Sequence, residues 1–347
     1  MKTLYLIDNF SLGGAQMVVK GIMENNQGNE KVFAFGLRDK PPHLPISHTQ
    51  AICFPGKQKY SLAPLRFLKH FITEQGIERI HCQLPRSILF GYLLKGMLPE
   101  LNYIVHEQGD VFESKLHAFL LRFYKKRADG ILACSGDTAA ALESRAKIDR
   151  DKLNVLYNFV DTTRFRAGKL KARPIQKIGF AGRIVERKGW REFVDLAAHF
   201  RNHPGLSFHM AGSGSEQGEL EKLKTRKGLS NLQIRGFISE VQEFYRDIDL
   251  LVVPSHFEPM GMVAIEAMAC GVPVLATDVP GLNEVARKGE NAWTYPPGSA
   301  HALIAATEAL LKLKEDEVLQ IREKALLHAR TFSYSNFYEQ LTSFYEN

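Results

Sequence analysis

Two glutamates, Glu258 and Glu266, carry the clearest chemical signal in this sequence. They lie in PSHFEPMGMVAIEAMACGVPVLAT, residues 254–277, in which a short predicted helix separates two apolar, strand-like segments. Every residue of 262–270 except Glu266 is apolar, so an unpaired carboxylate on that helix would cost several kcal/mol. Because an ionised carboxylate only accepts hydrogen bonds, we expect Glu266 to bind hydroxyl groups, such as the two of a ribose.

Groups that suit a phosphate lie near these glutamates. Glu258 and Gly261 fall where a predicted strand ends and the helix begins, so backbone N–H groups there can face an anion. A second segment, GFAGRIVERKGW (179–190), carries Arg183 and Lys188, whose charge-assisted hydrogen bonds to a phosphate would each contribute about 1.5–3 kcal/mol. Taken alone, the glutamates could be a helix cap and a solvated side chain, and the basic loop a surface turn. Their occurrence together favours a site for a phosphorylated sugar.

The two segments resemble the signature of the retaining glycosyltransferases of family 4, which have the GT-B fold. That family has two glutamates with seven residues between them, as Glu258 and Glu266 have. Its Gly-Arg and Lys-Gly elements are matched by Gly182, Arg183, Lys188 and Gly189. The resemblance extends over nearly the whole chain and is strongest over 177–277. It implies an α/β protein of GT-B architecture, in which two doubly wound Rossmann-like domains with parallel sheets face each other across a cleft.

The resemblance also assigns roles to residues outside these segments. His106, at the end of a predicted strand, would contact the transferred sugar and its phosphate, although a lone histidine in such a place is more often structural. Gly13 and Gly14 would close over the donor phosphates, although a plain turn explains a glycine pair equally well. The predicted catalytic residues are His106, Arg183, Lys188 and Glu258, and the predicted donor-binding residues are Gly13, Gly14, Gly182, Gly212, Gly214, Gly236, Phe237, Met260, Gly261, Met262 and Glu266.

The function implied is transfer of a hexose from a nucleoside diphosphate, with uridine expected, to a cell-envelope glycolipid, lipopolysaccharide or polysaccharide precursor. The anomeric configuration would be retained, and the leaving phosphate would accept the proton of the acceptor. One alternative is a sugar-nucleotide epimerase or hydrolase of similar fold. Another is a basic membrane- or nucleic-acid-binding protein without enzymatic activity, in which Glu258 and Glu266 would have no task. We therefore do not expect a nucleic acid partner.

No metal or other cofactor is expected beside the nucleotide-sugar substrate. Asp247-Ile248-Asp249 matches the Asp-x-Asp pattern of metal-dependent glycosyltransferases of a different fold. It directly precedes an apolar strand-like run, which places it at a helix-to-strand junction, where aspartates commonly cap or turn the chain. Two positions depart from the family pattern: Phe159 stands where glycine is usual, and Met260 replaces a common aromatic residue.

Bulk properties fit a protein of two domains. The chain has 347 residues, 45% of them hydrophobic and 24% charged, and it contains no apolar tract of 18 residues. The amino terminus, MKTLYLIDNF, lacks the long apolar region of an export signal. The cysteines lack the close spacing of zinc or redox motifs, so we expect reduced thiols in a cytoplasmic protein; they are Cys53, Cys82, Cys134 and Cys270.

The net charge of +7 and the pI of about 9.1 are compatible with nucleic acid, anionic lipid or phosphorylated substrates. KLHAFLLRFYKKR, residues 115–127, combines five basic residues with apolar residues at helical spacing. It could lie at the inner face of the cytoplasmic membrane, or it could pack its apolar stripe on the protein and leave its cations in water.

Alternation of strand and helix patterns sets the expected domain boundaries. Residues 1–160 form the predicted acceptor-binding domain, 161–176 a linker and 177–331 the nucleotide-sugar-binding domain. Residues 332–347, which are rich in aromatic side chains, are predicted as a helix that crosses back to the first domain.

Overall fold

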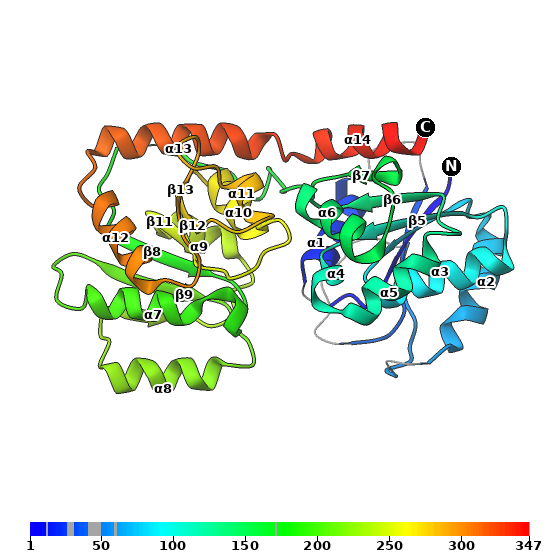
Figure 1. Cartoon of the computed structure of the whole chain (residues 1–347), viewed down its shortest axis with the longest axis horizontal. Coiled ribbons are helices and arrows are strands. Elements are labelled where there is room, and N and C mark those ends of the chain that lie inside the picture. The colour runs from blue at the N-terminus through cyan, green and yellow to red at the C-terminus, as the bar shows by residue number, and fades with distance from the viewer. Residues whose placement is uncertain (12, 26–30, 41–49, 59–60, 171, 347) are drawn as a thin grey trace. The chain divides into compact units, whose positions relative to one another are not determined.

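The computed structural model describes residues 1–11, 13–25, 31–40, 50–58, 61–170 and 172–346. The chain divides into two compact units, each with its own sheet (Figure 1). Unit 1 comprises Met1–Asn158 and Phe337–Asn347, and unit 2 comprises Phe159–Asn336. Both sheets are parallel and carry helices on both faces, which confirms the predicted α/β fold class.

The sheet of unit 1 has seven strands in the order β3-β2-β1-β4-β5-β6-β7. All neighbouring strands pair in parallel, so their carboxyl ends meet at one edge. The order reverses between β1 and β4, and such a switch point is where open α/β sheets bind ligands. The strands are β1 (Thr3–Ile7), β2 (Val32–Gly36), β3 (Ala51–Cys53), β4 (Arg79–Gln83), β5 (Asn102–Glu107), β6 (Gly130–Ala133) and β7 (Leu153–Val155).

Local signals explain several helix boundaries in unit 1. Ser114 and Ser135 accept hydrogen bonds from the amides of His117 and Thr138, and they cap the helices that follow. Pro85 stands in the first turn of α3, where a missing N–H costs nothing. The helices are α1 (Gly14–Asn25), α2 (Ala63–Gln75), α3 (Pro85–Met97), α4 (Asp110–Glu113), α5 (Lys115–Tyr124), α6 (Gly136–Ala146) and the unit 1 part of α14 (Tyr334–Glu346).

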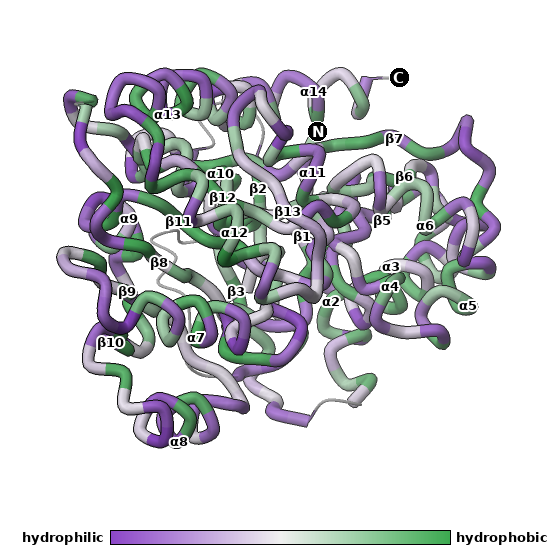
Figure 2. The backbone as a smooth tube through the Cα atoms, turned by 60° about the vertical axis from the view of Figure 1, so that its left-hand side comes forward, coloured by the Kyte–Doolittle hydropathy of each residue, from purple (hydrophilic) through white to green (hydrophobic). Residues whose placement is uncertain are grey.

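The sheet of unit 2 repeats this plan with six strands in the order β10-β9-β8-β11-β12-β13. Its pairs are again parallel, and the order reverses between β8 and β11. Figure 2 shows β8 and β11 mainly in the hydrophobic colour and much of α8 in the hydrophilic colour. The strands are β8 (Lys177–Ala181), β9 (Ser207–Ala211), β10 (Leu232–Ile234), β11 (Leu250–Val253), β12 (Val274–Thr277) and β13 (Trp293–Tyr295).

The core of unit 2 contains fully buried aromatic residues such as Trp190, Phe193 and Phe208. Phe159, which stands where the family has glycine, packs edge-on against Tyr334 at a ring distance of 5.0 Å. The helices are α7 (Trp190–His199), α8 (Gln217–Lys227), α9 (Val241–Asp247), α10 (Met262–Ala269), α11 (Leu282–Val285), α12 (Ala300–Leu310), α13 (Glu315–Arg330) and the start of α14. No helix within the described ranges is long and apolar enough to cross a bilayer.

Candidate functional site

Most of the predicted site residues of unit 2 lie in loops that follow the carboxyl ends of its strands. The loop after β8 carries Gly182, Arg183 and Lys188, and the loop after β11 carries Glu258. Because β8 and β11 flank the switch point of the strand order, the two loops border the place where such sheets bind ligands. They are also joined directly, since the amide of His256 donates to the carbonyl of Arg187 at 2.8 Å.

The glycine loops after β8, β9 and β10 are joined by backbone hydrogen bonds. Gly182 N donates to Ala211 O at 3.0 Å, and Gly212 N donates to Gly236 O at 2.7 Å. Gly212 has φ +136°, and a Cβ there would lie 1.8 Å from the carbonyl oxygen of Gly182, so a side chain cannot be placed at this position. The structure therefore brings together three predicted glycines. Gly214 is close to them, since a Cβ on it would lie 2.2 Å from Ile184 O.

Glu216, which the sequence analysis missed, holds the loop that carries Lys188. Its Oε1 accepts from the amide of Glu186 at 2.7 Å, and its Oε2 accepts from Trp190 Nε1 at 2.8 Å. Glu186 and Trp190 lie 30 and 26 residues away in the sequence. The only advance signal was its position directly after a glycine loop that was itself predicted to form the pocket.

Lys188 and Glu258 form an ion pair between Nζ and Oε1, and Ser255 Oγ also donates to Oε1, at 2.9 Å. The Glu258 side chain is 6% exposed and that of Lys188 16%. Glu258 makes no capping hydrogen bond to α10, so the interpretation as a helix cap is wrong. A carboxylate has about four acceptor positions, which leaves Glu258 capacity for ligand hydroxyls. Arg183 is exposed, and its side chain makes no hydrogen bond or ion pair with the residues that the structure describes, although its carbonyl accepts from Val185 N at 3.0 Å.

Glu266 is partly buried on α10, and its partner is a protein hydroxyl. Tyr245 OH donates to Glu266 Oε2 at 2.8 Å. Burial raises the pKa of Glu266 to about 7, although the Tyr245 hydrogen bond opposes this rise. The sequence predicted that Glu266 needs a hydrogen-bond partner because its helix is apolar. In the structure Tyr245 supplies such a hydrogen bond, so the partner is not a ligand alone. Oε1 has no hydrogen bond to a described residue and keeps its acceptor positions.

The remaining predicted donor-binding residues of unit 2 lie around the same loops. Gly261 is the N-terminal boundary of α10 at φ +85°, between the buried Met260 and the partly exposed Met262. The first N–H groups of the helix lack intrahelical partners, as in any α-helix. Gly236 has open space around it, and Phe237 beside it is 56% exposed.

The predicted residues of unit 1 also stand at a carboxyl edge. Gly13 O accepts from Met17 N at 3.0 Å in the first turn of α1, and a Cβ on Gly14 would meet nothing within 4 Å. Asp8, a residue that the sequence analysis did not select, follows β1 at the switch point and accepts from Ser87 N at 2.9 Å. Burial raises the pKa of Asp8 to about 6, against the effects of Ser87, Arg86 and Arg38.

His106 is the second-to-last residue of β5, the strand next to β4, and is fully buried. Its Nδ1 lies 3.1 Å from Nε2 of His81 on the neighbouring strand β4. Burial lowers the pKa of His106 to about 3, so the ring is neutral at physiological pH. A neutral imidazole with so low a pKa is a poor general base, and it is suited to hydrogen bonding instead.

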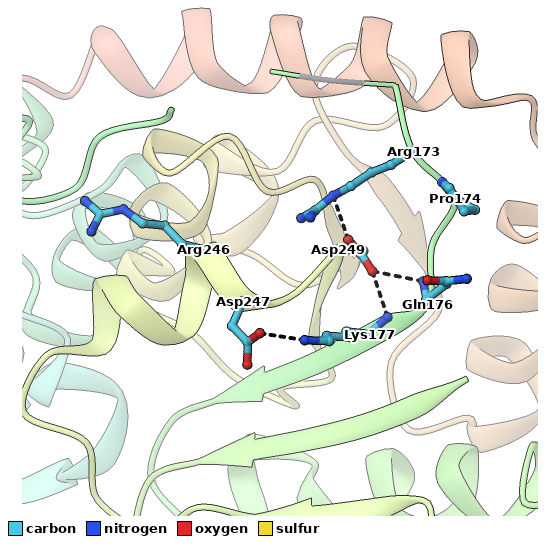
Figure 3. Close-up of a pocket in the computed structure, with 7 residues that line it drawn as sticks. All are labelled: Arg173, Pro174, Gln176, Lys177, Arg246, Asp247 and Asp249. Carbon is cyan, nitrogen blue, oxygen red and sulfur yellow. Dashed lines mark hydrogen bonds and ion pairs between the residues drawn. The ribbon is translucent and has the colours of Figure 1, made fainter. Parts of the chain in front are cut away.

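The Asp-x-Asp pair lies at the opposite, amino edge of the sheet in unit 2, lining a cavity of about 170 Å³ (Figure 3). Asp247 pairs with Lys177 at 2.7 Å and with Arg235 at 2.6 Å. Asp249 pairs with Arg173 at 2.8 Å and accepts from two backbone amides. Asp247 is the last residue of α9 and Asp249 directly precedes β11, which confirms the predicted helix-to-strand junction. Within the described residues, no group of three His, Cys, Asp or Glu side chains is arranged for a metal ion.

The basic aromatic helix proves to have two apolar faces. Ala118, Leu121 and Tyr124 of α5 are buried against unit 1. A second set is exposed to solvent: Leu116 at 67%, Phe119 at 49% and Phe123 at 44%. The packing interpretation therefore accounts for one face only, and this exposed face (Leu116, Phe119, Phe123) remains without a covering element of the described chain.

Comparison with known proteins agrees with this geometry. The family model "Glycosyl transferases group 1" matches residues 161–326, and "Glycosyltransferase Family 4" matches 22–164. D-inositol 3-phosphate glycosyltransferase of Nocardia farcinica is 31% identical, over 63% of this chain and 52% of that protein. The lipopolysaccharide core biosynthesis glycosyltransferase LpsE of Rhizobium meliloti is 33% identical, over 38% of each chain. The matched part of the chain spans about half the length of the first curated relatives.

Among solved structures, HepE of Anabaena in complex with UDP and glucose has a TM-score of 0.86. It is 19% identical, and the match covers 100% of both chains, which shows a common fold. With two family models that together extend over most of its length and with glycosyltransferases as relatives, this chain belongs to the family 4 glycosyltransferases of the GT-B fold.

Proposed function

We propose that the protein is a retaining glycosyltransferase that moves a hexose from UDP to a saccharide or glycolipid acceptor, without a metal ion. The observation that carries this proposal is the carboxyl edge of unit 2. There the Lys188–Glu258 ion pair, the Arg183 guanidinium, which has no partner among the described residues, and three glycine loops joined by backbone hydrogen bonds border one switch point.

Each group at this edge has a task in breaking a bond between a sugar and a diphosphate. Arg183 is free to bind the diphosphate, and Lys188 can share its three donors between Glu258 and a phosphate oxygen. Charge that develops on the leaving phosphate strengthens both contacts, so they lower the barrier of the chemical step. These two cations take the place of a divalent metal ion.

The carboxylates are assigned to hydroxyl groups. Glu258 accepts from the hydroxyls of the donor sugar, and Glu266 accepts from the ribose while Tyr245 holds its other oxygen. The neutral His106 is a poor base, so the leaving phosphate takes the proton of the acceptor. This proton transfer to the leaving group accompanies retention of the anomeric configuration. HepE, the neighbour in fold, was solved with UDP and with UDP-glucose, which supports a uridine donor here.

For the acceptor we propose a cell-envelope glycolipid, lipopolysaccharide or polysaccharide precursor, reached at the inner face of the cytoplasmic membrane. The relative LpsE is named for lipopolysaccharide core biosynthesis. The exposed face of α5 presents Leu116, Phe119 and Phe123 beside several cations, a combination that suits an anionic membrane surface.

Liposome sedimentation tests the membrane contact. Lys125 and Arg127 donate to the carbonyls of Lys147 and Tyr92, so replacing them would also disturb the fold. Phe119→Ser with Phe123→Ser removes exposed rings instead, and the matched control is Leu327→Ser, whose side chain is 66% exposed on α13. Binding to anionic liposomes should fall several-fold in the double variant only. Unchanged sedimentation would leave the exposed face of α5 as an ordinary solvated surface.

The activity itself is tested with a panel of nucleotide sugars. A thermal-shift screen finds the donor, because a ligand that binds the folded protein raises its melting temperature. Incubation with that donor and an acceptor should give a product whose anomeric configuration, measured by NMR, equals that of the donor. Inversion would refute the retaining mechanism, and conversion of the donor without any acceptor would favour the epimerase or hydrolase alternative.

A further inference from the structure

The central strand β4 of unit 1 has one face that is polar and completely buried. Arg79, His81 and Gln83 alternate along it and are 2%, 0% and 0% exposed, whereas Ile80 and Cys82 on the opposite face belong to the apolar core. Buried polar groups are costly unless they are hydrogen-bonded. This row of three side chains, called here the polar file of β4, therefore needs hydrogen-bond partners.

Hydrogen bonds connect this file to the carboxy-terminal helix. The last residues of α14 lie against unit 1, to which they belong (Figure 1). Tyr345 OH lies 2.6 Å from His81 Nδ1, and His81 Nε2 lies 3.1 Å from His106 Nδ1. The helix is thereby linked through His81 to the histidine at the carboxyl edge of the sheet.

The far end of the file is incompletely satisfied. His106 and Gln83 are paired in the register of β4 and β5. His106 Nε2 and both amide atoms of Gln83 are buried without a hydrogen-bond partner of normal geometry among the described residues. These orphan groups stand at the carboxyl edge, where a ligand of unit 1 is expected.

A neutral imidazole has one donor nitrogen and one acceptor nitrogen, so the hydrogen bonds set the protonated position. If Tyr345 donates to His81 Nδ1, then His81 carries its proton on Nε2 and donates to His106 Nδ1. His106 must then carry its own proton on Nε2. If Tyr345 accepts instead, every proton moves to the other nitrogen, and His106 Nε2 becomes an acceptor.

The surroundings of Tyr345 favour the first arrangement. The guanidinium of Arg79 lies over the Tyr345 ring at 3.7 Å from its centre, and this positive charge makes the phenol a stronger donor. Tyr5 OH lies 3.3 Å from Tyr345 OH, a contact in which Tyr5 can be the donor.

We propose that Tyr345, acting through His81, is a positioning residue that holds His106 as its Nε2–H tautomer, so that His106 offers a hydrogen-bond donor to the ligand at this edge. Only the identity of that ligand, the sugar or phosphate of the donor, rests on the proposed function. The tautomer depends on contacts within unit 1 alone.

Ring ¹⁵N NMR of the full-length protein tests this proposal without any substrate. In the wild type, His106 should show a protonated Nε2 and an unprotonated Nδ1. Tyr345→Phe removes one oxygen and should shift His106 toward the other tautomer or a mixture of the two. Tyr338→Phe, the same change on the same helix, serves as the matched control and should leave the His106 signals unchanged.

A wild-type His106 protonated on Nδ1 would overturn the proposal, and this result needs no variant. The same holds if Tyr345→Phe leaves the tautomer unchanged. Kinetics add a separate readout: kcat should fall about tenfold in Tyr345→Phe with little change in KM, because the donor bond is aimed at charge that develops during the reaction. Unchanged kcat despite a changed tautomer would refute the ligand contact of His106. A wild type without any transfer, but with the expected tautomer, would refute the proposed function alone.

Discussion

Removal of the Lys188 ammonium should destabilise unit 2 because the Glu258 carboxylate would be left buried and unpaired. Lys188→Met keeps most of the apolar stem and deletes the charge. With side-chain exposures of 16% and 6%, the pair is largely shielded from water. Breaking a buried pair by removing one partner costs about 3–5 kcal/mol. Since Ser255 still donates to Glu258, we expect the lower end, about 3 kcal/mol.

The assay is urea unfolding followed by tryptophan fluorescence. Both tryptophans, Trp190 and Trp293, lie in unit 2, so the signal reports that unit selectively. A loss of about 3 kcal/mol corresponds to a fall of about 6–12 °C in the melting temperature of a unit of this size. Lys188→Met/Glu258→Gln should recover about 2 kcal/mol of the loss, because the amide carries no charge to be left unpaired.

A matched lysine in the same unit controls for loss of charge as such. Lys227 pairs with Asp195 at 3.0 Å, but the two side chains are 34% and 43% exposed. Lys227→Met should therefore cost less than about 1 kcal/mol. The reasoning is refuted if Lys188→Met is as stable as the wild type, or if the double variant is no more stable than the sum of the single changes predicts.

Three further predictions concern the same unit. Arg183→Ala should leave stability within about 0.5 kcal/mol of the wild type and weaken UDP binding at least tenfold, because the Arg183 side chain has only the ligand to bind. Calorimetric titration measures the UDP affinity of both proteins, and equal affinities would show that Arg183 does not bind the nucleotide. Gly212→Ala should lower the free energy of unfolding by more than about 2 kcal/mol, since its Cβ would lie 1.8 Å from a carbonyl oxygen. Gly228→Ala, where the Cβ would enter open space, should lower it by only about 1 kcal/mol. Similar losses for the two variants in urea unfolding would contradict the close approach at Gly212. For Glu266 the folded pKa of about 7 exceeds the ordinary value of 4.5, so its contribution to stability is fully present below pH 4.5 and is lost as the pH rises through 7. Glu266→Gln should reduce this change in stability with pH by up to about 3 kcal/mol. If the variant shows the same pH dependence of unfolding as the wild type, the pKa of Glu266 is not shifted.

The sheets and the edge that carries the site could be predicted because their signals are local. Buried parallel strands are continuous apolar runs, as in Leu250–Val253, and the loops that follow them meet at one edge whatever the remaining packing. Gly182, Gly212 and Gly236 were assigned to donor binding by the family resemblance, and each lies shortly after a strand that ends at this edge. β13, at Trp293–Tyr295, was not predicted, because three residues at the edge of a sheet carry little periodicity.

The partners of the charged residues could not be predicted, since they come from distant parts of the chain. Glu266 bonds Tyr245 from another helix, and Lys188 reaches Glu258 across 70 residues. The link from Tyr345 to His81 spans 264 residues and depends on where α14 docks. No pattern along the sequence encodes such pairs, because they follow from tertiary packing. The exposed face of α5 is a related case: the pattern indicated one apolar stripe, and the helix has two.

Hydrogen–deuterium exchange of the full-length protein with and without saturating UDP tests the central claim most directly. If the carboxyl edge of unit 2 binds the nucleotide, then amide protection should rise in the loops at 182–189 and 212–216 and over 258–266. The cavity at the amino edge, around Lys177 and Asp249, should exchange as before. Protection confined to that amino edge, or none at a concentration that saturates binding, would contradict the account.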